Sequence, residues 1–479
     1  MPTSLKYKGC VDMKKIVIES LILSQKVAIL ENDKLVELFI DDNKEEKITS
    51  NIYRGIVKNI KPGMEAAFVD IGFEKLAYLK LPKEHNIKSG NEILVQINKE
   101  GIGTKGPKLN LEISISGRYL VYIPSNDRTT MSNKIKDEKE RFRLKKLIKI
   151  LNKDNQGLIV RTEAQGCSID DLKKDLEELI KRYEIIQKEF KLGIGPKLLY
   201  KELDFASKYI KDNINESVEK IIINDKDKYE KLKSIIKDIN KKYIEKIELL
   251  ENENVFDLYK VQNQIEKSLN KKVWLKNGGY LIIEKTEALT VIDVNTGKFT
   301  GNIKLQDTVT KTNIEAAKEI ANQLRVRDIG GMILIDFIDM AKIENKNQVI
   351  QTLESELKKD KRKCEVFGMT KLGLVEMTRR RERNSIDLYY VENCRECNEN
   401  KYTKSIKYII DDIEKEIIRI YKHTSYKNIT ILLNKNTYLE INEKFKDMID
   451  NISKKYDIII MLQKDKNIEK DKIKIIYNT

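Results

Sequence analysis

Two short apolar runs, each ending in an acidic residue, constrain the fold of this chain more than any other feature. The runs at residues 289–297 and 331–340 are rich in β-branched residues, as buried strands typically are. Between them, apolar residues recur at helical spacing over residues 313–326. A strand, a helix and a second strand form a crossover unit, in which the two strands are parallel and near neighbours. The pattern therefore predicts that Asp293 and Asp336 lie close together at equivalent strand ends.

A pair of neighbouring carboxylates suits a magnesium ion, which takes one or two carboxylates and keeps its other positions for water or phosphate oxygens. A structural role fits the pattern equally well, with the two acids capping helices or pairing with Arg325 and Arg327. The chain holds only 2 histidines, so phosphodiester chemistry would depend on a metal and carboxylates and not on paired histidines.

Length and charge bound the class of protein. A chain of 479 residues predicts about three or four domains. Lys and Arg total 91 against 76 acidic residues, a net charge of +15, which favours a polyanionic partner such as nucleic acid. The alternative is a lysine-rich composition set by an AT-rich genome. No apolar run approaches the roughly 18 residues of a membrane span.

The cysteines and the N-terminus indicate a cytoplasmic protein. Five scattered cysteines argue against a secreted disulfide framework and for a reducing compartment. The N-terminal residues lack the apolar core of a signal peptide. Met13 offers an alternative start to Met1, which would leave residues 1–12 as a tail.

Short strands separated by turn signals predict a small β-barrel in residues 50–118. Phe68 and Tyr78 fall in these strands among several basic residues, and together they favour a surface that stacks bases and tracks phosphates of a single strand. The alternative is that Phe68 is a core residue and Tyr78 a half-buried strand residue. The basic residues are Arg54, Lys58, Lys75 and Lys80.

Two arginine-containing segments point to phosphate contacts. The strand predicted at 157–160 ends in Arg161 and Thr162, a guanidinium and a hydroxyl that suit a phosphate group. The alternative is an ion pair between Arg161 and Glu163 or Asp170. The arginine-rich run at 379–383 favours polyanion contact or is a solvated helix end.

Cys394 and Cys397 form a single CxxC motif, which is half of a tetrahedral zinc site. No second pair of ligands follows at finger spacing, so a complete site would need the same motif from another chain and would imply a dimer. A redox role would need a βαβ context that is absent here, and a structural accident is the other alternative.

Periodicity predicts the remaining elements in outline, with a small α+β segment at the C-terminal end. Strands are expected at 15–18, 26–30, 35–40, 52–57, 66–71, 76–81, 92–97, 280–284, 429–433 and 457–461, and helices at 170–190, 228–250, 345–359 and 406–420.

Several of these segments, taken in order, resemble the ribonuclease E/G family. The match runs from Met13 to about Lys422, and the length is closer to the shorter, ribonuclease G-like members. The segments that carry it are Asn-Ile-Tyr-Arg-Gly at 51–55, Glu-Ala-Ala-Phe-Val-Asp-Ile-Gly at 65–72, Gly-Leu-Ile-Val-Arg-Thr at 157–162, Thr-Glu-Ala-Leu-Thr-Val-Ile-Asp-Val-Asn at 286–295, Gln-Leu-Arg-Val-Arg-Asp-Ile-Gly-Gly at 323–331, Ile-Asp-Phe-Ile-Asp-Met at 335–340 and the CxxC motif.

The resemblance implies a multidomain α/β (α+β) fold. An S1/OB β-barrel would be inserted in a ribonuclease-H-like domain, followed by a DNase-I-like catalytic domain and a small α+β C-terminal domain. The expected boundaries are 1–12 (tail), 13–48 (first ribonuclease-H-like segment), 49–118 (S1 barrel), 119–215 (5′-sensing region), 216–278 (second ribonuclease-H-like segment), 279–390 (DNase-I-like), 391–400 (zinc link) and 401–479 (C-terminal domain).

The resemblance also implies residue roles and an assembly. Asp293 and Asp336 match the Mg²⁺ ligands, and Asn295 matches the polar residue beside the metal. The family assembles as dimers or dimers of dimers, joined by zinc at Cys394 and Cys397. The RNA-contacting positions matched are Phe68, Tyr78 and Lys105, and the 5′-monophosphate pocket is matched by Gly117, Val121, Arg161 and Thr162, with Lys363 completing it.

Three departures from the family pattern bear on function. Lys363 stands where the family commonly has arginine, which keeps the charge but loses the bidentate fork. The CxxC motif is followed by Asn-Glu-Asn at 398–400 instead of a glycine-rich turn. The length implies that the long scaffold of the larger family form is not expected, and with it partner recruitment of that kind.

The expected activity is Mg²⁺-dependent endonucleolytic cleavage of single-stranded, A/U-rich RNA in rRNA processing and mRNA decay. The products would carry 5′-phosphate and 3′-hydroxyl ends, and 5′-monophosphate ends would stimulate cleavage. The alternative is a non-catalytic S1-type RNA-binding protein.

Overall fold

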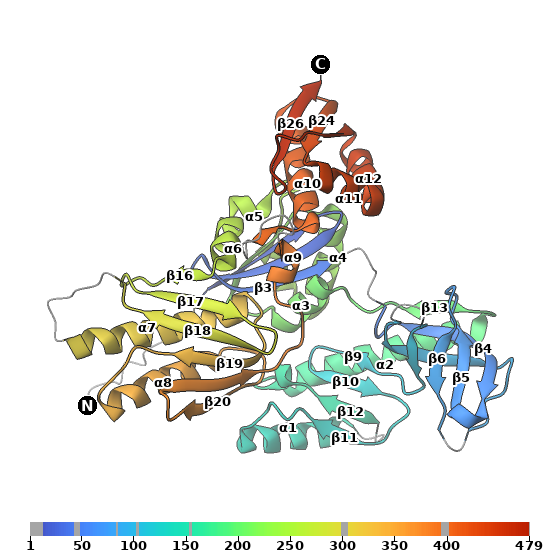
Figure 1. The fold of residues 1–479 in the computed structure, drawn as a ribbon. Coiled ribbons are helices and arrows are strands. Elements are labelled where there is room, and N and C mark those ends of the chain that lie inside the picture. The colour runs from blue at the N-terminus through green and yellow to red at the C-terminus, as the bar shows by residue number, and fades with distance from the viewer. Residues whose placement is uncertain are drawn as a thin grey trace. The chain divides into compact units, whose positions relative to one another are not determined.

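The computed structural model describes residues 13–42, 48–82, 85–101, 105–152, 156–297, 305–393 and 402–478. The chain divides into two compact units, drawn together in Figure 1. The larger unit comprises Met1–Lys44 and Ile214–Thr479, and the smaller unit comprises Glu45–Asn213. The expected mixed α/β architecture is confirmed, and each unit is described by itself below.

The first sheet of the larger unit joins two segments that are distant in sequence. Strand β1 pairs in antiparallel fashion with β2, and β2 with β3, whereas β14 runs parallel to β1 on its other side. The strand order is β15-β14-β1-β2-β3. The strands are β1 (Lys14–Ser20), β2 (Ser24–Glu31), β3 (Lys34–Asp42), β14 (Val218–Ile223) and β15 (Ile247–Leu249).

The helix predicted at 228–250 is wrong at its C-terminal end. Helix α4 (Lys226–Ile239) ends there because Asn240 adopts an extended conformation, and its side chain caps the short 3-10 helix η3 (Lys241–Lys246). The residues that follow form β15, which pairs with β14. Pairing in the sheet outweighs the local helical periodicity that the sequence shows.

The second sheet of the larger unit carries Asp293 and is called the Asp293 sheet below. Its strand order is β16-β17-β18-β19-β21-β20, and β18 and β19 are its parallel neighbours. Helix α7 (Leu305–Val326) connects these two strands, so the predicted crossover is confirmed. The strands are β16 (Lys272–Trp274), β17 (Tyr280–Lys285), β18 (Leu289–Asn295), β19 (Gly331–Asp336), β20 (Cys364–Met369) and β21 (Leu374–Arg379).

Helices α7 and α8 (Ile343–Leu357) cover one face of the Asp293 sheet (Figure 1). Ala317 and Ile320 of α7 pack with Val349 of α8 against Ile292 and Ile333 of the strands. The side chains of a strand alternate between its two faces, so the residues next to these in the chain point to the uncovered face.

The C-terminal region of the larger unit is a small α+β fold, as predicted, on helix α10 (Ile406–His423). Its sheet has the order β25-β24-β26. Short elements lead into α10, namely α9 (Asp387–Tyr390), β22 (Val391–Asn393) and β23 (Tyr402–Lys404). The other elements are β24 (Asn428–Leu433), α11 (Lys435–Lys444), α12 (Lys446–Tyr456), β25 (Ile459–Lys464) and β26 (Ile473–Asn478).

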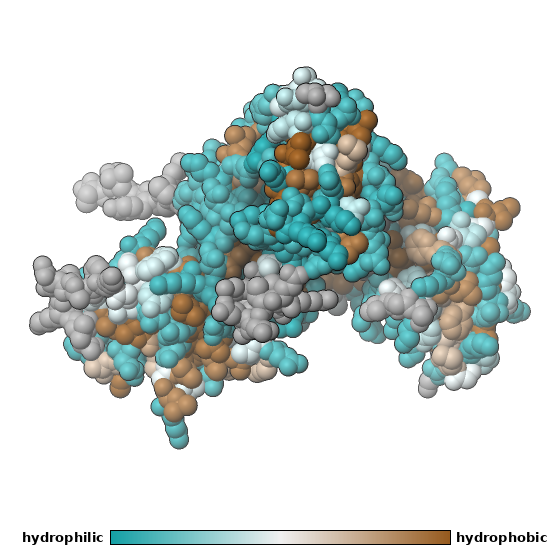
Figure 2. Space-filling model, turned by 45° about the horizontal axis from the view of Figure 1, so that its top comes forward, coloured by the Kyte–Doolittle hydropathy of each residue, from teal (hydrophilic) through white to brown (hydrophobic). Residues whose placement is uncertain are grey.

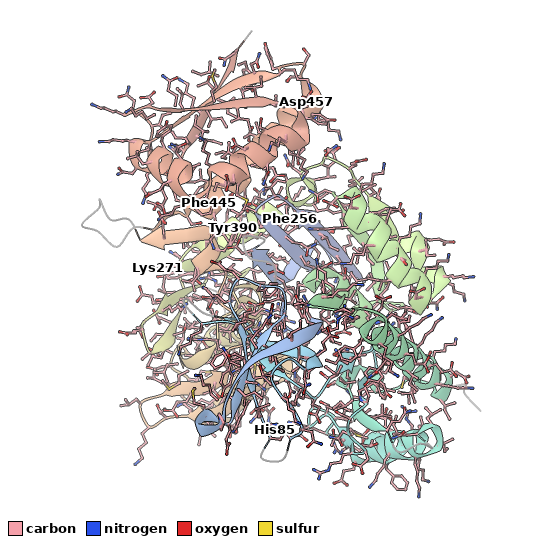
Figure 3. The ribbon with its side chains drawn as sticks, turned by 90° about the vertical axis from the view of Figure 1, so that its right-hand side faces the viewer. His85, Phe256, Lys271, Tyr390, Phe445 and Asp457 are labelled. Carbon is pink, nitrogen blue, oxygen red and sulfur yellow. The ribbon has the colours of Figure 1, made fainter. Side chains whose placement is uncertain are left out.

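A buried ion network ties α10 to the first sheet. The Lys26 ammonium on β2 lies 2.7 Å from Asp411 of α10 and 3.5 Å from Glu19 of β1, and all three side chains are fully buried. Burial by itself lowers the pKa of Lys26, but Asp411 and Glu19 outweigh it and hold the pKa of Lys26 well above its usual value. Phe256 and Tyr390, labelled in Figure 3, belong to the apolar cluster beside this network.

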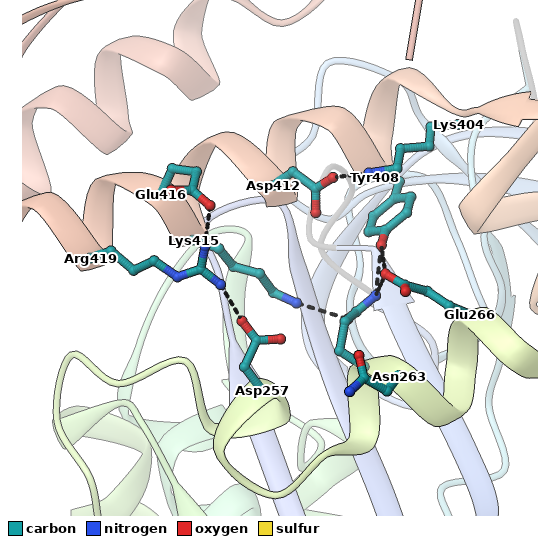
Figure 4. Close-up of a pocket in the computed structure, with 10 residues that line it drawn as sticks. Asp257, Asn263, Glu266, Lys404, Tyr408, Asp412, Lys415, Glu416 and Arg419 are labelled. Atoms are coloured by element: carbon teal, nitrogen blue, oxygen red, sulfur yellow. Dashed lines mark hydrogen bonds and ion pairs between the residues drawn. The ribbon is translucent and has the colours of Figure 1, made fainter. Parts of the chain in front are cut away.

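A pocket of about 320 Å³ lies between α10 and the helices α5 (Val255–Leu258) and α6 (Val261–Leu269), as Figure 4 shows. Several of its charged side chains form ion pairs with one another. Lys404 donates to Asp412 at 2.7 Å, and Arg419 donates to Asp257 at 2.7 Å. These paired charges give the pocket a structural role in holding α10 in place.

The smaller unit contains the expected barrel. Five strands close in the order β4-β5-β6-β8-β7, because β7 pairs back onto β4, and β13 (Lys197–Tyr200) adds to the outside of β4. Apolar side chains such as Val57, Val69 and Leu79 fill the interior. The barrel strands are β4 (Ile52–Lys61), β5 (Ala66–Asp70), β6 (Ala77–Lys80), β7 (Glu92–Lys99) and β8 (Lys108–Asn110).

A second sheet of the smaller unit, in the order β11-β12-β10-β9, packs with α1 and α2 around its own apolar cluster. Ser168 and Asp171 form a capping box that starts α2. The elements are β9 (Ile115–Ser116), β10 (Leu120–Ile123), β11 (Thr129–Met131), α1 (Glu138–Leu151), β12 (Gly157–Val160), α2 (Ile169–Leu192) and α3 (Phe205–Asn213).

The surface seen in Figure 2 is mostly hydrophilic, in keeping with a chain in which 35% of residues are charged. Among the described residues, no helix combines the length and apolar character needed to cross a bilayer.

Candidate active site and RNA-binding surfaces

Asp293 and Asp336 occupy directly opposite positions on the parallel strands β18 and β19. Their neighbours Ile292 and Ile335 are fully buried against the helices, so both acids point to the uncovered face of the Asp293 sheet. Adjacent strands lie about 4.8 Å apart. The fold therefore brings the two carboxylates together, as the sequence predicts.

Asn295 orients the first acid. Its side-chain Nδ2 donates a hydrogen bond of 2.7 Å to Oδ2 of Asp293, two residues before it on the same face of β18. The strand ends at Asn295, and the turn after it contains Gly297, whose φ is +63° and where a Cβ would lie 2.3 Å from the carbonyl oxygen of Gly278. Only glycine fits this turn, which fixes where β18 leaves the sheet.

The carboxylates of Asp293 and Asp336 carry like charges that no neighbouring cation among the described residues neutralises. Partial burial, followed by the negative charges of Asp293 and Asp339, raises the pKa of Asp336 above its usual value. Among the residues that the structure describes, no ion pair involves Asp293 or Asp336. The alternative pairing with Arg327 is wrong, because that guanidinium donates to Gln323 and to the carbonyl of Asn270.

These residues fit a magnesium ion. Two adjacent carboxylates with no cationic partner among the described residues leave negative charge that a divalent cation would neutralise. No group of three or more His, Cys, Asp or Glu side chains gathers as a metal site in the described regions of the chain. A two-carboxylate site is the arrangement in which Mg²⁺ keeps positions for water and phosphate.

Asn313 of helix α7 holds the segment that follows Asp336, a role that was not predicted from the sequence. This fully buried residue of α7 donates to the carbonyl of Ile338 at 2.8 Å and accepts from its N–H at 3.1 Å. Phe337 and Met340 are buried on either side. The segment that follows Asp336 is therefore held against the crossover helix.

Phe68 and Tyr78 are cross-strand partners on the outer surface of the barrel. Their ring centroids lie 6.2 Å apart in an edge-to-face arrangement, and both side chains are half-buried. Tyr78 is also the register partner of Lys108 on β8, which is exposed. Phe68 does not belong to the barrel core, so that alternative is wrong, whereas the half-buried state expected of Tyr78 is confirmed. Lys105 is exposed just before β8.

Arg54 corrects the predicted set of basic surface residues. It is 2% exposed, and within the described parts of the chain its guanidinium donates to main-chain carbonyls at and beyond the end of α2. It therefore completes the C-terminus of that helix and cannot track phosphates. The acceptors are the carbonyl oxygens of Glu189, Phe190, Ile194 and Gly195.

Arg161 is engaged by an acid that the sequence did not reveal. Its guanidinium forms two hydrogen bonds with the carboxylate of Asp212, at 2.8 and 2.6 Å, and one of 2.6 Å with the carbonyl of Gly117. Burial alone lowers the pKa of Arg161, but Asp212 outweighs it and the pKa is raised. Of the two partners predicted for Arg161, Glu163 has its Oε2 atom 3.5 Å from Nε of Arg161, whereas Asp170 forms no ion pair with it.

A second buried acid shapes the same region. The Asp175 carboxylate accepts hydrogen bonds from three successive N–H groups at residues 118–120. A Cβ on Gly117 would lie 2.4 Å from that carboxylate, so glycine is required there. Val121 lies in β10, and the Thr162 hydroxyl is 3.1 Å from that of Ser132. Arg161 contacts Gly117 and is followed directly by Thr162, and Val121 is the register partner of Ser116, the residue before Gly117.

Three further sequence-predicted features have different outcomes. Lys363 lies in the larger unit, exposed, with Glu365 at 3.2 Å. The arginine run is not a helix end, because Arg379 ends β21 and is buried in ion pairs with Asp328 and Asp360. Cys394 and Cys397 lie outside the described residues.

Comparison with known proteins agrees with this arrangement. The family described as the Ribonuclease E/G family matches the chain over residues 114–382. Ribonuclease G of Haemophilus influenzae is 38% identical over 419 residues, covering 83% of this chain and 85% of the relative. Ribonuclease G of Escherichia coli (strain K12) is 36% identical, covering 83% and 86%. Ribonuclease E of Haemophilus influenzae is 32% identical, covering 93% of this chain and 50% of the relative.

These matches, together with a barrel and a paired-acid site, define the class of protein as an endoribonuclease. The chain belongs to the ribonuclease E/G family.

Proposed function

We propose that this chain is a Mg²⁺-dependent endoribonuclease that cleaves single-stranded, A/U-rich RNA and leaves 5′-phosphate and 3′-hydroxyl ends. The observation that carries the proposal is the register pairing of Asp293 with Asp336 on one uncovered sheet face. Ribosomal RNA processing and mRNA decay in the cytoplasm are the roles that such an activity would serve.

In the proposed mechanism, Asp293 and Asp336 would hold the cation, and Asn295 fixes the orientation of Asp293. A bound Mg²⁺ would supply a Lewis acid that activates water and neutralises charge on the phosphate. The uncovered face of the Asp293 sheet is exposed to solvent, so a single strand of RNA can cross it without entering a cavity. On the barrel, Phe68 and Tyr78 would stack on unpaired bases, and Lys105 and Lys108 would contact phosphates.

The region around Arg161 would bind a 5′-monophosphate, which stimulates cleavage. Arg161 already gives hydrogen bonds to Asp212, so a phosphate must compete with that carboxylate for the guanidinium. We expect Arg161→Ala to bring the rates on 5′-monophosphorylated and 5′-hydroxyl RNA together. Asp212→Asn removes the competing charge, so the preference for the monophosphate should be kept or increased. If Arg161→Ala and Asp212→Asn showed the same ratio of rates on 5′-monophosphorylated and 5′-hydroxyl RNA, this assignment would be contradicted.

We also propose that Cys394 and Cys397 supply half of a structural zinc site shared with a second copy of the chain, which makes the working form a homodimer or homotetramer. The motif contains two thiolates, and a tetrahedral structural site needs four ligands.

The decisive experiment is end-group analysis of 5′-labelled single-stranded RNA incubated with Mg²⁺, with and without EDTA. Asp293→Asn and Asp336→Asn should each lower the cleavage rate by about 100-fold or more and leave RNA binding in EDTA unchanged. Glu376→Gln is the matched control, because Glu376 is an exposed acid on the same sheet face, opposite Leu334. If the wild-type chain binds RNA but never cuts it, the alternative of a non-catalytic S1-type binding protein holds.

A further inference from the structure

The edge of the Asp293 sheet carries a cluster that the proposed mechanism does not use. Lys272 of β16 is the register partner of Ile282, and Ile282 is the partner of Asp293. Residues that are directly opposite in register share a face of the sheet. The Lys272 side chain therefore lies on the uncovered face, in the row that contains the acid pair.

A second row runs beside the first. Trp274 is the register partner of Tyr280, and Tyr280 is the partner of Asn295, the residue that orients Asp293. Two strand spacings, about 10 Å, separate Trp274 from Asn295. Trp274 thus lies beside the acid pair and not on it, and Tyr280 lies between Trp274 and Asn295.

The three side chains of this cluster already lie against one another. The Trp274 and Tyr280 rings have centroids 5.4 Å apart at 63°. The Lys272 ammonium lies 4.0 Å from the Trp274 ring centroid and 3.7 Å from that of Tyr280. In the described regions of the chain, Lys272 has no carboxylate partner, whereas its neighbour Lys271 pairs with Glu284. A cation held against two rings without an acid is open to an anionic ligand.

Packing does not account for Trp274. Its neighbours Val273 and Leu275 pack against the core of the Asp293 sheet, but Trp274 is 64% exposed. Tryptophan is usually highly buried, because its large apolar surface gains from leaving water. An exposed indole with a lysine on its face is the combination by which proteins stack bases and contact the backbone of single strands.

We propose that Trp274, Tyr280 and Lys272 form a nucleotide subsite, in which Trp274 stacks on a base of the single-stranded substrate next to the phosphate held at Asp293 and Asp336. Lys272 contacts the phosphate of that nucleotide. This inference rests on the proposed function, since the same substrate strand crosses the acid pair. The subsite is sequence-tolerant, because every base presents a π-face.

The chain has a single tryptophan, so its intrinsic fluorescence reports on this position alone. A short single-stranded oligoribonucleotide is titrated into the whole protein in EDTA, where it is not cut, and binding is followed in parallel by anisotropy of a labelled end. Saturable quenching with the same midpoint as the anisotropy is expected. A pre-annealed duplex of the same sequence should quench far less, since its bases are not free to stack.

Substitutions test whether the contact contributes to binding. Trp274→Ala should weaken single-strand binding by about 5- to 150-fold, and Trp274→Phe should restore most of it. In Mg²⁺, Trp274→Ala should raise KM much more than it lowers kcat. Phe142→Ala is the matched control, because Phe142 on α1 is 62% exposed with Lys146 at 4.5 Å from its ring, and its loss should leave both parameters unchanged.

The outcomes separate this inference from the proposed function. RNA that binds without quenching, or a Trp274→Ala variant with unchanged KM in an active enzyme, would overturn the subsite and leave the nuclease intact. Fluorescence that changes on dilution without RNA would also overturn it, by showing that a second copy of the chain covers Trp274. Quenching and a loss of affinity in a protein that never cuts RNA would support the subsite and refute the nuclease.

Discussion

The Cα atoms of Asp293 and Asp336 are register partners on two parallel strands that α7 connects, so the backbone itself brings the two carboxylates to the same place. Neither acid depends on a flexible loop for its position. Sites built on strands are held more precisely than sites on loops, and this suits a metal that demands near-ideal geometry.

The like charges around Asp336 predict a pH dependence of metal binding. A carboxylate must lose its proton to bind a divalent cation, and burial, Asp293 and Asp339 raise the pKa of Asp336. Metal binding is therefore lost at a higher pH than for an ordinary aspartate. Asp339→Asn removes one like charge and lowers the pKa of Asp336. The acid limb, which is the pH range over which Mn²⁺ affinity falls on acidification, should therefore shift to lower pH. Mn²⁺ titrations followed by EPR between about pH 4 and pH 7 measure this limb. A shift to higher pH would contradict the assigned cause, and Glu376→Gln serves as the control.

The outer face of the barrel predicts two different signatures of RNA binding. Tyr78→Ala and Phe68→Ala should each weaken single-strand binding by about 1–3 kcal/mol and leave its salt dependence unchanged, because stacking releases no counterions. Lys108→Ala, the next residue in the same row, should reduce the slope of log affinity against log salt by about 0.7. Affinities measured over a series of salt concentrations distinguish the two. Tyr78→Phe keeps the ring and should bind nearly as the wild type does.

Arg54 predicts a stability effect without a binding effect. Arg54→Met leaves carbonyl oxygens at the end of α2 without their donor and should lower the free energy of unfolding by about 3 kcal/mol. Chemical denaturation measures this loss. Lys58→Met removes an exposed ion pair with Asp70 and should cost less than about 1 kcal/mol. If folded Arg54→Met protein shows a smaller salt dependence of RNA binding, Arg54 contacts phosphates after all.

The proposed zinc link can be tested through the reactivity of the cysteine thiols. Burial raises the pKa of both Cys167 and Cys364 to about 11, so neither thiol should react with a disulfide reagent in the native protein at neutral pH. In a Cys10→Ser background, reactive thiols then report on Cys394 and Cys397. We expect little reaction before a zinc chelator is added and two reactive thiols afterwards. Two thiols that react fully without the chelator would contradict a bound zinc.

The sequence predicts the crossover well because local signals agree with the fold there. β-branched runs favour strands, helical spacing marks α7, and handedness leaves only one arrangement for the unit. Asp293, Asn295 and Asp336 can therefore be placed from the sequence alone. The barrel follows from turn signals for the same reason.

Long-range partners cannot be predicted in this way. Arg54 has the local context of a surface cation on its strand, yet carbonyls more than a hundred residues away surround it. Asp212 and Asp175 lie on helices that give no sign of the chain segments they will meet. Periodicity records which face of an element is apolar, but it does not record what covers that face.

The ion network around Lys26 has a consequence for how the protein is made. Ser24 and Asp411, which belong to the same buried contact, are 387 residues apart, so a chain emerging from the ribosome carries Lys26 and Glu19 long before Asp411, the nearer of the two acids, has been made. An unpaired charge in a sheet interior is strongly destabilising. A chain that stops short of α10 is therefore expected to be unfolded and degraded, and cells should not accumulate a shortened but active nuclease.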